Sequence, residues 1–330
     1  MGGQSNALGD QIFPGFVDVL EQKLPGVELS MIRSTRGASP IERWDEDFDD
    51  TWPSLVDAIE SAESEVAGMI WYQGEENCFE PDGYEDKLRS LVARLRAAVG
   101  DPNFVFILVQ LANNTGNGKA PNLAILREHQ LRYGDSDPRV ATIPALDSSM
   151  NDYVHITSEA RQELGRRAGF AALRLRYGLD CAAIPGPRLV RQSFRDASRR
   201  EVVVEFEHVY GALELEERGW ENSFGVLPDG MTGLQGTAVP SSAEFFFESR
   251  YLIFPERITA SGTEVTLTFA EPLSEEAALG FGIAGNQRIA QPFGDDRAAN
   301  TPMAGLHDAE GFPPPAYFPR PIEPSIDASR

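Results

Sequence analysis

Residues 66–77 read VAGMIWYQGEEN, and this stretch decides the class of fold. It begins with an unbroken apolar run, 66–72, which stops at Gln73. A short apolar run without alternation is typical of a strand buried on both faces, as in a parallel sheet covered by helices. The polar residues that follow then lie at the carboxyl end of the strand, where open α/β sheets bind their ligands.

The same pattern extends on both sides of this stretch, from residue 27 to about residue 178. Short runs rich in Val, Ile, Leu or Phe predict strands at 27–32, 66–72, 104–111 and 140–146. Longer amphipathic segments predict helices at 52–64, 84–99, 122–133 and 158–177. Strands that alternate with helices predict an α/β fold, with a parallel sheet and helices on both of its faces.

The pattern changes at Pro185-Gly186-Pro187, which is typical of a linker. Beyond it, segments of β type separated by Gly, Pro and Asn predict a smaller antiparallel domain, with strands at 201–206, 212–215, 243–247, 251–254 and 264–269. From about residue 294 the chain is irregular and rich in proline, which predicts a tail that is either wrapped on the surface or loose. We therefore expect an α/β domain over 1–184, a small β domain over 185–293 and a tail over 294–330.

Composition excludes several classes of function. The formal net charge of the 330-residue chain is −22, and such an acidic surface repels phosphate backbones, so we expect no nucleic-acid partner. No apolar run approaches the roughly 18 residues of a membrane-spanning helix. The four histidines are scattered without a metal-binding spacing. The chain as given shows no signal peptide, and its sequence leaves the compartment and the oligomeric state open.

The chain opens with Gly2-Gly3-Gln4-Ser5-Asn6, in which glycines surround a serine. Glycines let the backbone turn sharply where a strand passes into a helix. A serine on such a turn projects into solvent and brings its own N–H close to a substrate carbonyl. Ser5 is therefore a candidate nucleophile; the alternative is a flexible leader.

Asp152 and His155 lie three residues apart, just after the apolar run 140–146. A serine hydroxyl becomes a good nucleophile only when a base takes its proton, and a carboxylate on the other ring nitrogen holds that base in one tautomer. Of the four histidines, only His155 lies in a loop at a predicted strand end with an acid close by. The alternative is a plain surface loop, because Asp-x-x-His is common by chance.

Two further segments offer hydrogen-bond donors for a developing oxyanion. Gln73 carries an amide and Gly74 permits close approach, directly after the run 66–72. Gly37, in the segment 35–44 that follows the run 27–32, offers a backbone N–H to the same place. The alternatives are a helix N-terminus for the first segment and an ordinary turn for the second.

In their order along the chain, these motifs resemble those of the SGNH hydrolase superfamily, and more narrowly those of its sialate O-acetylesterase and carbohydrate esterase family 6 branch. Residues 3–6 match its Gly-Gln-Ser-Asn motif, and 37–44 are close to Gly-Gly-Ser/Thr-x-Ile-x-x-Trp. Residues 71–77 match Trp-x-Gln-Gly-Glu-x-Asn, and 152–155 match Asp-x-x-His. The resemblance covers about residues 2 to 175.

This resemblance implies a flavodoxin-like three-layer α/β/α sandwich that removes O-acetyl groups from sialate-type or xylan-type carbohydrates without a cofactor. The substrate is then a small-molecule or polysaccharide ester. Ser5 is implied as the nucleophile, His155 as its base and Asp152 as the group that orients the base. The oxyanion hole is implied to consist of the N–H groups of Ser5 and Gly37 and the side chain of Gln73, with support from Gly74, Glu75 and Asn77.

Two features depart from the family pattern. Ala38 replaces the second glycine of the doubled pair, and a left-handed backbone there would be strained. Only four residues precede Ser5, where the family has a strand of several apolar residues. We therefore expect either that sequence upstream of residue 1 is missing or that another segment fills this position of the sheet.

Other functions compatible with the same motifs are a general short-chain carboxylesterase and a catalytically inactive carbohydrate-binding protein. Three tryptophans, Trp44, Trp52 and Trp71, could stack on a sugar, although core packing is the expected role for at least two of them.

Overall fold

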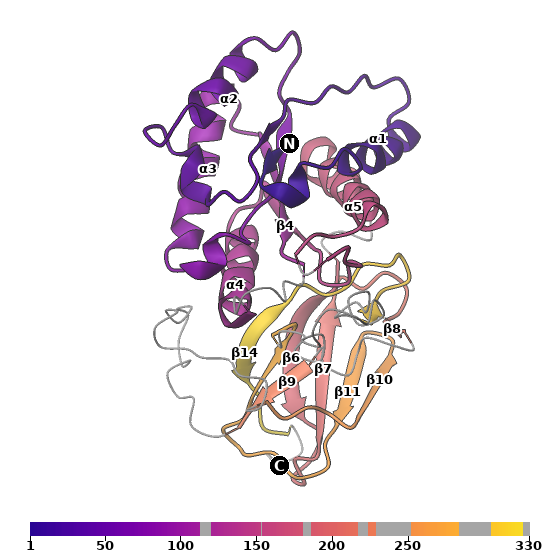
Figure 1. Ribbon diagram of the computed structural model, residues 1–330. Coiled ribbons are helices and arrows are strands. Elements are labelled where there is room, and N and C mark those ends of the chain that lie inside the picture. Colours follow the sequence, from indigo (N-terminus) through magenta and orange to yellow (C-terminus); the bar gives the residue numbers. More distant parts are fainter. Residues whose placement is uncertain are drawn as a thin grey trace.

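The computed structural model describes residues 1–112, 120–152, 154–180, 186–216, 224–228, 252–283 and 305–325. The first part of the chain forms an α/β unit, and antiparallel sheets follow beside it (Figure 1). The predicted fold class is confirmed. Among the described residues, no helix is both long and apolar enough to cross a membrane.

The α/β unit is built on a five-stranded parallel sheet in the order β2-β1-β3-β4-β5. Its strands are β1 (Gly2–Gly3), β2 (Ser34–Thr35), β3 (Gly68–Tyr72), β4 (Val105–Gln110) and β5 (Val140–Pro144). Every residue of β4 and β5 is buried, which explains why their sequences show no alternation. The apolar runs at 66–72, 104–111 and 140–146 correctly predicted β3, β4 and β5.

Helices cover both faces of this sheet. They are α1 (Ile12–Lys23), α2 (Thr51–Glu60), α3 (Tyr84–Val99), α4 (Ala120–Ser136) and α5 (Ser158–Tyr177). In Figure 1, α1 and α5 lie on one side of the sheet, and α2, α3 and α4 lie on the other. The unit is therefore the expected three-layer sandwich.

Helix α1, which the sequence pattern did not predict, packs closely against α5. A Cβ atom on Gly15 would lie 2.1 Å from the Gln162 carbonyl oxygen, and one on Gly165 would lie 2.0 Å from the Ile12 carbonyl oxygen. Both glycines are therefore needed for the two backbones to approach.

Strand β1 occupies an interior position of the sheet, between β2 and β3, where the family pattern has the strand before the serine. It contains only Gly2 and Gly3, paired with β2 on one side and β3 on the other. A Cβ atom on Gly3 would lie 2.0 Å from the Tyr72 carbonyl oxygen, and the φ of Gly3 is +126°. Glycine is therefore required where this strand turns toward Ser5.

The predicted strand at 27–32 is wrong. Residues 27–33 have no strand structure, and β2 begins only at Ser34. The neighbouring strand β1 contains just two residues, so most of the segment before Ser34 has no strand to pair with. Its contacts with the start of the chain are the Met1 amine, which donates to the Ile32 carbonyl at 2.6 Å, and the Ser34 N–H, which donates to the Met1 carbonyl at 2.9 Å.

Antiparallel sheets make up the region after residue 186. One sheet has the order β10-β11-β7-β6, a second β14-β12-β9 and a third β13-β8. Their strands are β6 (Arg188–Phe194), β7 (Glu201–Glu207), β8 (Glu214–Leu215), β9 (Phe224–Leu227), β10 (Arg257–Ser261), β11 (Glu264–Thr268), β12 (Ala278–Phe281), β13 (Leu306–His307) and β14 (Tyr317–Pro321).

Three of the predicted strands in this region are present: 201–206 in β7, 212–215 in β8 and 264–269 in β11. The predicted strand at 243–247 lies outside the described residues. The one at 251–254 begins outside them, and its described part forms only an isolated bridge between Ile253 and Val226.

Residues 305–325, which we predicted to be part of a tail, are instead built into the fold. Strand β14 is the edge of a three-stranded sheet, a position where its prolines need no hydrogen-bond partner. Phe312 belongs to the hydrophobic core of the α/β unit, whereas Tyr317 belongs to the core of the β region. The boundary between the α/β and β domains near residue 185 stays a prediction.

Candidate active site

A chain of hydrogen bonds joins the three residues that sequence analysis selected as nucleophile, base and orienting acid. Ser5 follows β1 after one residue, Gln4, and opens a short 3-10 helix, Ser5–Ala7. The Oγ of Ser5 lies 3.1 Å from Nε2 of His155, and Nδ1 of His155 lies 2.8 Å from Oδ2 of Asp152. The fold thus brings together residues that are 150 positions apart in sequence.

The carboxylate of Asp152 is fixed from both sides. Its other oxygen, Oδ1, accepts hydrogen bonds from the backbone N–H groups of Val154 at 2.8 Å and His155 at 2.7 Å. Partial burial acts to raise the pKa of Asp152, but the hydrogen bonds from the His155 ring and from these N–H groups outweigh it, and the pKa is lowered. Asp152 is therefore ionised at neutral pH and orients the His155 ring.

The three side chains are reachable from solvent. The side chain of His155 is 37% exposed and that of Asp152 is 44% exposed, and Ser5 is half-buried.

Asn6 links the nucleophile to the segment that carries the base. Its side chain is fully buried, and its Nδ2 donates to Oε1 of Glu75 at 2.6 Å and to the Val154 carbonyl at 3.0 Å. Its Oδ1 accepts the backbone N–H of Ile156 at 3.1 Å. Sequence analysis assigned no role to Asn6, although its place directly after Ser5 in the motif was a signal.

Two backbone N–H groups are available at the site. Among the described residues, the N–H groups of Ser5 and Gly37 have no hydrogen-bond acceptor. Gly37 is exposed, and a Cβ atom there would meet only the side chain of Leu8, at 3.7 Å. Its loop is tied to β1 because the Arg36 N–H donates to the Gly3 carbonyl at 2.9 Å.

Ala38, which replaces a glycine of the family motif, adopts the left-handed backbone that the comparison with that motif predicted. Its φ is +46°. For a residue with a Cβ atom this conformation is strained by about 1 kcal/mol or more. The strain lies next to one of the available N–H groups.

Gln73 lies deeper than sequence analysis predicted. Its side chain is fully buried, and its Nε2 donates to the Asn77 Oδ1 at 2.6 Å and to the Ser39 carbonyl at 3.0 Å. Its Oε1 accepts the hydroxyl of Tyr84 at 2.7 Å. Both amide hydrogens are thus engaged by protein acceptors, and donation to a substrate oxygen would compete with them.

Of the three residues expected to support the site, Asn77 bonds directly to Gln73, whereas Glu75 bonds to Asn6. Oδ1 of Asn77 also accepts the backbone N–H of Ile41 at 2.8 Å, which joins the segment after β3 to the loop of Gly37. Gly74 has a φ of +140°, and a Cβ atom there would lie 2.5 Å from the side chain of Leu126.

The tryptophans do not form a sugar platform, because Trp44, Trp52 and Trp71 are all buried. The exposed apolar side chains on the segments around the site are Leu8 (43%), Phe48 (53%) and Phe79 (57%), which sequence analysis missed. Within the part of the chain that the structure describes, no three His, Cys, Asp or Glu side chains gather as metal ligands would.

Comparison with known proteins agrees with this arrangement. The sequence profile of the family described as "Carbohydrate esterase, sialic acid-specific acetylesterase" matches residues 2–174. No curated protein sequence matches the chain.

Among solved structures, a carbohydrate acetylesterase from Xanthomonas citri superposes with a TM-score of 0.66 at 22% identity, over 93% of this chain. The chain spans 64% of that structure's length. A protein from Arabidopsis thaliana matches with a TM-score of 0.43 at 22% identity, over 48% of this chain and 66% of its own. An acetylxylan esterase from Geobacillus stearothermophilus matches with a TM-score of 0.38 at 16% identity, over 54% of this chain and 85% of its own.

Proposed function

Because the chain belongs to the sialic acid-specific acetylesterase family of carbohydrate esterases, we propose that it is a serine esterase that removes acetyl groups from O-acetylated carbohydrates. The observation that carries this proposal is the unbroken series of contacts from Asp152 through His155 to Ser5. An ionised acid, an imidazole and a serine in this order are what activation of a serine hydroxyl requires.

In the proposed reaction, Ser5 Oγ bonds to the acetyl carbonyl carbon while its proton passes to Nε2 of His155. The bond between that carbon and the sugar oxygen then breaks, and the leaving sugar oxygen takes the proton from His155 and becomes a hydroxyl. An acetyl group remains on Ser5. A water molecule, deprotonated by His155, attacks this acetyl-enzyme, the bond to Ser5 Oγ breaks as the proton returns to Ser5, and acetic acid leaves and ionises to acetate in solution. Asp152 stabilises the positive charge that His155 carries in each step.

We assign the oxyanion hole to the N–H groups of Ser5 and Gly37. Each of these donors lacks an acceptor among the described residues, so each can bond to a substrate oxygen without first losing a partner. An oxyanion donor of this kind contributes about 3 kcal/mol to the transition state.

Gln73 fits a different role from the one that its motif implies. We place it as a positioning residue that joins the loop of Gly37 to Asn77 through its two donated hydrogen bonds. It acts as a third donor only if its amide leaves the Ser39 carbonyl when substrate binds.

The general short-chain carboxylesterase remains a second candidate, because Leu8 is exposed beside Gly37 and offers an apolar contact for an acyl chain. Hydrolysis of p-nitrophenyl acetate and p-nitrophenyl octanoate separates the two. Acetate release is then measured from O-acetyl sialic acid and from acetylated xylan, with Ser5→Ala as the blank.

Rapid acetate release from a carbohydrate, with no octanoate cleavage, supports the acetylesterase and identifies the sugar class. Octanoate cleavage at a rate comparable with acetate cleavage favours the general esterase. Failure of a fluorophosphonate to modify Ser5, together with no hydrolysis of any ester, would refute both and leave the inactive carbohydrate-binding protein.

A further inference from the structure

The loop that carries Asp152 and His155 is a small hairpin that Asn6 contacts near Val154 and Ile156 and that α5 contacts at its first residues. We name residues 145–157 the Asp–His loop; of these, residue 153 lies outside the described residues. The two arms of the hairpin are joined by a bridge between Met150 and Ile156 and by the Thr157 N–H, which donates to the Ser149 carbonyl at 2.9 Å. The hairpin is therefore a compact unit, and its placement depends both on the Asn6 bonds to Val154 and Ile156 and on how its first residues are held against the sheet.

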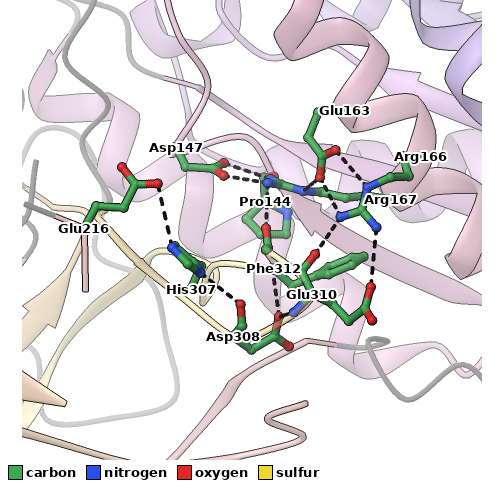
Figure 2. A network of polar contacts seen from close by, with 11 residues as sticks. Pro144, Asp147, Glu163, Arg166, Arg167, Glu216, His307, Asp308, Glu310 and Phe312 are labelled. Carbon is green, nitrogen blue, oxygen red and sulfur yellow. Dashed lines mark hydrogen bonds and ion pairs between the residues drawn. The ribbon is translucent and has the colours of Figure 1, made fainter. Parts of the chain in front are cut away.

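Arg167 of α5 holds the root of this loop. Its Nη1 donates to Oδ1 of Asp147 at 2.8 Å, and its Nη2 donates to Oδ2 at 2.5 Å (Figure 2). Nη1 also donates to the carbonyl of Pro144, the last residue of β5, at 2.8 Å. One guanidinium thus fixes the end of the strand and the start of the loop together.

Every N–H group of the Arg167 guanidinium has a hydrogen-bond acceptor. It offers five N–H groups, and four of them are used by Asp147, by Pro144 and by Oε1 of Glu163. The fifth N–H donates to the carbonyl of Gly311 at 3.0 Å. Gly311 lies 144 residues further along the chain. Because the Arg167 side chain is only 3% exposed, water has little access to replace that acceptor.

Gly311 belongs to a closed turn, which we name the 308–312 turn. Oδ1 of the fully buried Asp308 accepts the N–H groups of Glu310 at 3.0 Å and Phe312 at 2.9 Å, and the Asp308 N–H donates to the Phe312 carbonyl at 3.0 Å. In this turn the carbonyl of Glu310 accepts a hydrogen bond from Arg166 (Figure 2). The carbonyl of Gly311 accepts one from Arg167.

Phe312 completes the contact between the turn and α5. Its ring is buried in the core of the α/β unit, 6.1 Å from the ring of Phe170. The guanidinium carbons of Arg166 and Arg167 lie 5.2 Å and 5.7 Å from its centroid. The turn therefore covers Arg167 with an aromatic face and also supplies its last acceptor.

We propose that Arg167, Asp147 and the 308–312 turn form a positioning device that sets the Asp–His loop, so that part of the active-site framework lies outside the region 2–174 shared with the family. This inference rests on the proposed function, because it takes Asp152 and His155 as the reacting pair. Arg167 and Asp147 are positioning residues: they act on His155 only through the loop.

The test compares Asp147→Asn with Asp137→Asn in the full chain. An asparagine amide opposes one guanidinium N–H and breaks the paired bonds. Asp137 is a matched control, because it also makes paired hydrogen bonds to an arginine, Arg96, at 2.7 Å and 3.2 Å. Asp137 precedes β5, whereas Asp147 follows it, so the control lies at the end of the strand away from the Asp–His loop. Activity is measured well below the melting temperature of both variants.

We expect Asp147→Asn to lower kcat roughly ten- to a hundredfold with KM within about twofold, and to slow fluorophosphonate labelling of Ser5 in parallel. Hydrogen exchange in peptides of the Asp–His loop should become at least about tenfold faster. Asp137→Asn should leave kcat, labelling and loop exchange within about twofold of the parent chain. Loss of stability alone would not separate the two variants in this way.

Phe312→Leu tests the turn itself, with Phe206→Leu in the core of the β region as its control. We expect only Phe312→Leu to speed exchange in the Asp–His loop. Equal kcat and equal loop exchange in Asp147→Asn and Asp137→Asn would overturn the proposal. If the parent chain proves to have no esterase activity, the proposed function fails, whereas faster loop exchange in Asp147→Asn and in Phe312→Leu would still support the positioning device.

Discussion

At the scale of single residues, the contact between His155 and Ser5 allows three substitutions to test the proposed nucleophile, its base and the acid that orients the base. We expect Ser5→Ala and His155→Ala to lower kcat by at least about a thousandfold, because each removes a reacting group. Asp152→Asn should cost roughly a hundredfold or more, since the amide keeps the shape of the carboxylate but not its charge or its preference for one tautomer. Rates with p-nitrophenyl acetate and an unchanged melting curve provide the check. Full activity in Ser5→Ala would reject Ser5 as the nucleophile.

Ala38 allows a prediction in which stability rises. Its φ of +46° strains the folded backbone, so Ala38→Gly should stabilise the folded state by about 1 to 2 kcal/mol. Glycine also gives the unfolded chain more conformational freedom, which offsets about 0.5 to 1 kcal/mol of that gain. We expect a net gain of between zero and about 1.5 kcal/mol in the free energy of unfolding, measured in urea. The N–H of Gly37 is unaffected by this change.

The matched control is the reciprocal change Gly26→Ala. Gly26 has a φ of +87°, and nothing lies within 4 Å of an added Cβ atom, so only backbone strain is introduced. We expect this variant to lose about 1 kcal/mol. A loss of stability in Ala38→Gly would mean that the Ala38 side chain contributes packing that outweighs the strain.

At the scale of the elements, the motifs around Ser5, Asp152 and His155 could be predicted, whereas the contacts that hold them could not. The sequence marked strand ends and polar residues beyond them, which is enough to place a site at one edge of the sheet. It did not show that Asn6 bonds to Ile156 or that Gln73 bonds to Asn77, because such bonds depend on how separate loops meet.

Helix α1 shows why an element was missed. Pro14 and Gly15 read as breakers of a helical pattern. In the structure Pro14 lies in the first turn of α1, where a missing N–H costs nothing. Gly15 is where the helix meets the backbone of α5. By contrast, α5 was predicted over its full length from its amphipathic pattern. In the structure, Thr157 caps its first turn and the left-handed Gly178 ends it.

The packing of α1 on α5 gives a prediction at this scale. Gly165→Ala places a Cβ atom 2.0 Å from the Ile12 carbonyl oxygen, a contact that only separation of the helices can relieve. We expect a loss of about 3 kcal/mol in the free energy of unfolding. Ser90→Ala, at an exposed position of α3, should change it by less than about 0.5 kcal/mol. A tolerated Gly165→Ala would show that α1 can move away from α5 at low cost.

At the scale of the whole molecule, the α/β unit and the β region share buried polar groups. Nε2 of Gln110, at the end of β4, donates to the Ala316 carbonyl at 2.8 Å, and its Oε1 accepts the Ala316 N–H at 2.7 Å. Arg127 is almost fully buried and donates to the Gly282 carbonyl at 2.8 Å. Burial lowers the pKa of Arg127 to about 10. These links could not be predicted from the sequence, because the partners of Gln110 and Arg127 are backbone groups more than 150 residues away.

These links predict that the last described segment is required for folding. A chain that ends at residue 304 loses the buried apolar side chains of Phe312, Tyr317 and Phe318, each worth about 1.5 to 3 kcal/mol, and leaves the Gln110 amide without its partner. This sum approaches the 5 to 15 kcal/mol that usually separates folded from unfolded domains. We therefore expect the shortened chain to lack a cooperative urea transition by circular dichroism, whereas a chain that ends at residue 325 keeps one. A cooperative transition and esterase activity in the chain ending at 304 would show that the α/β unit is stable without residues 305–325, and would also remove the basis for the role we assign to the 308–312 turn.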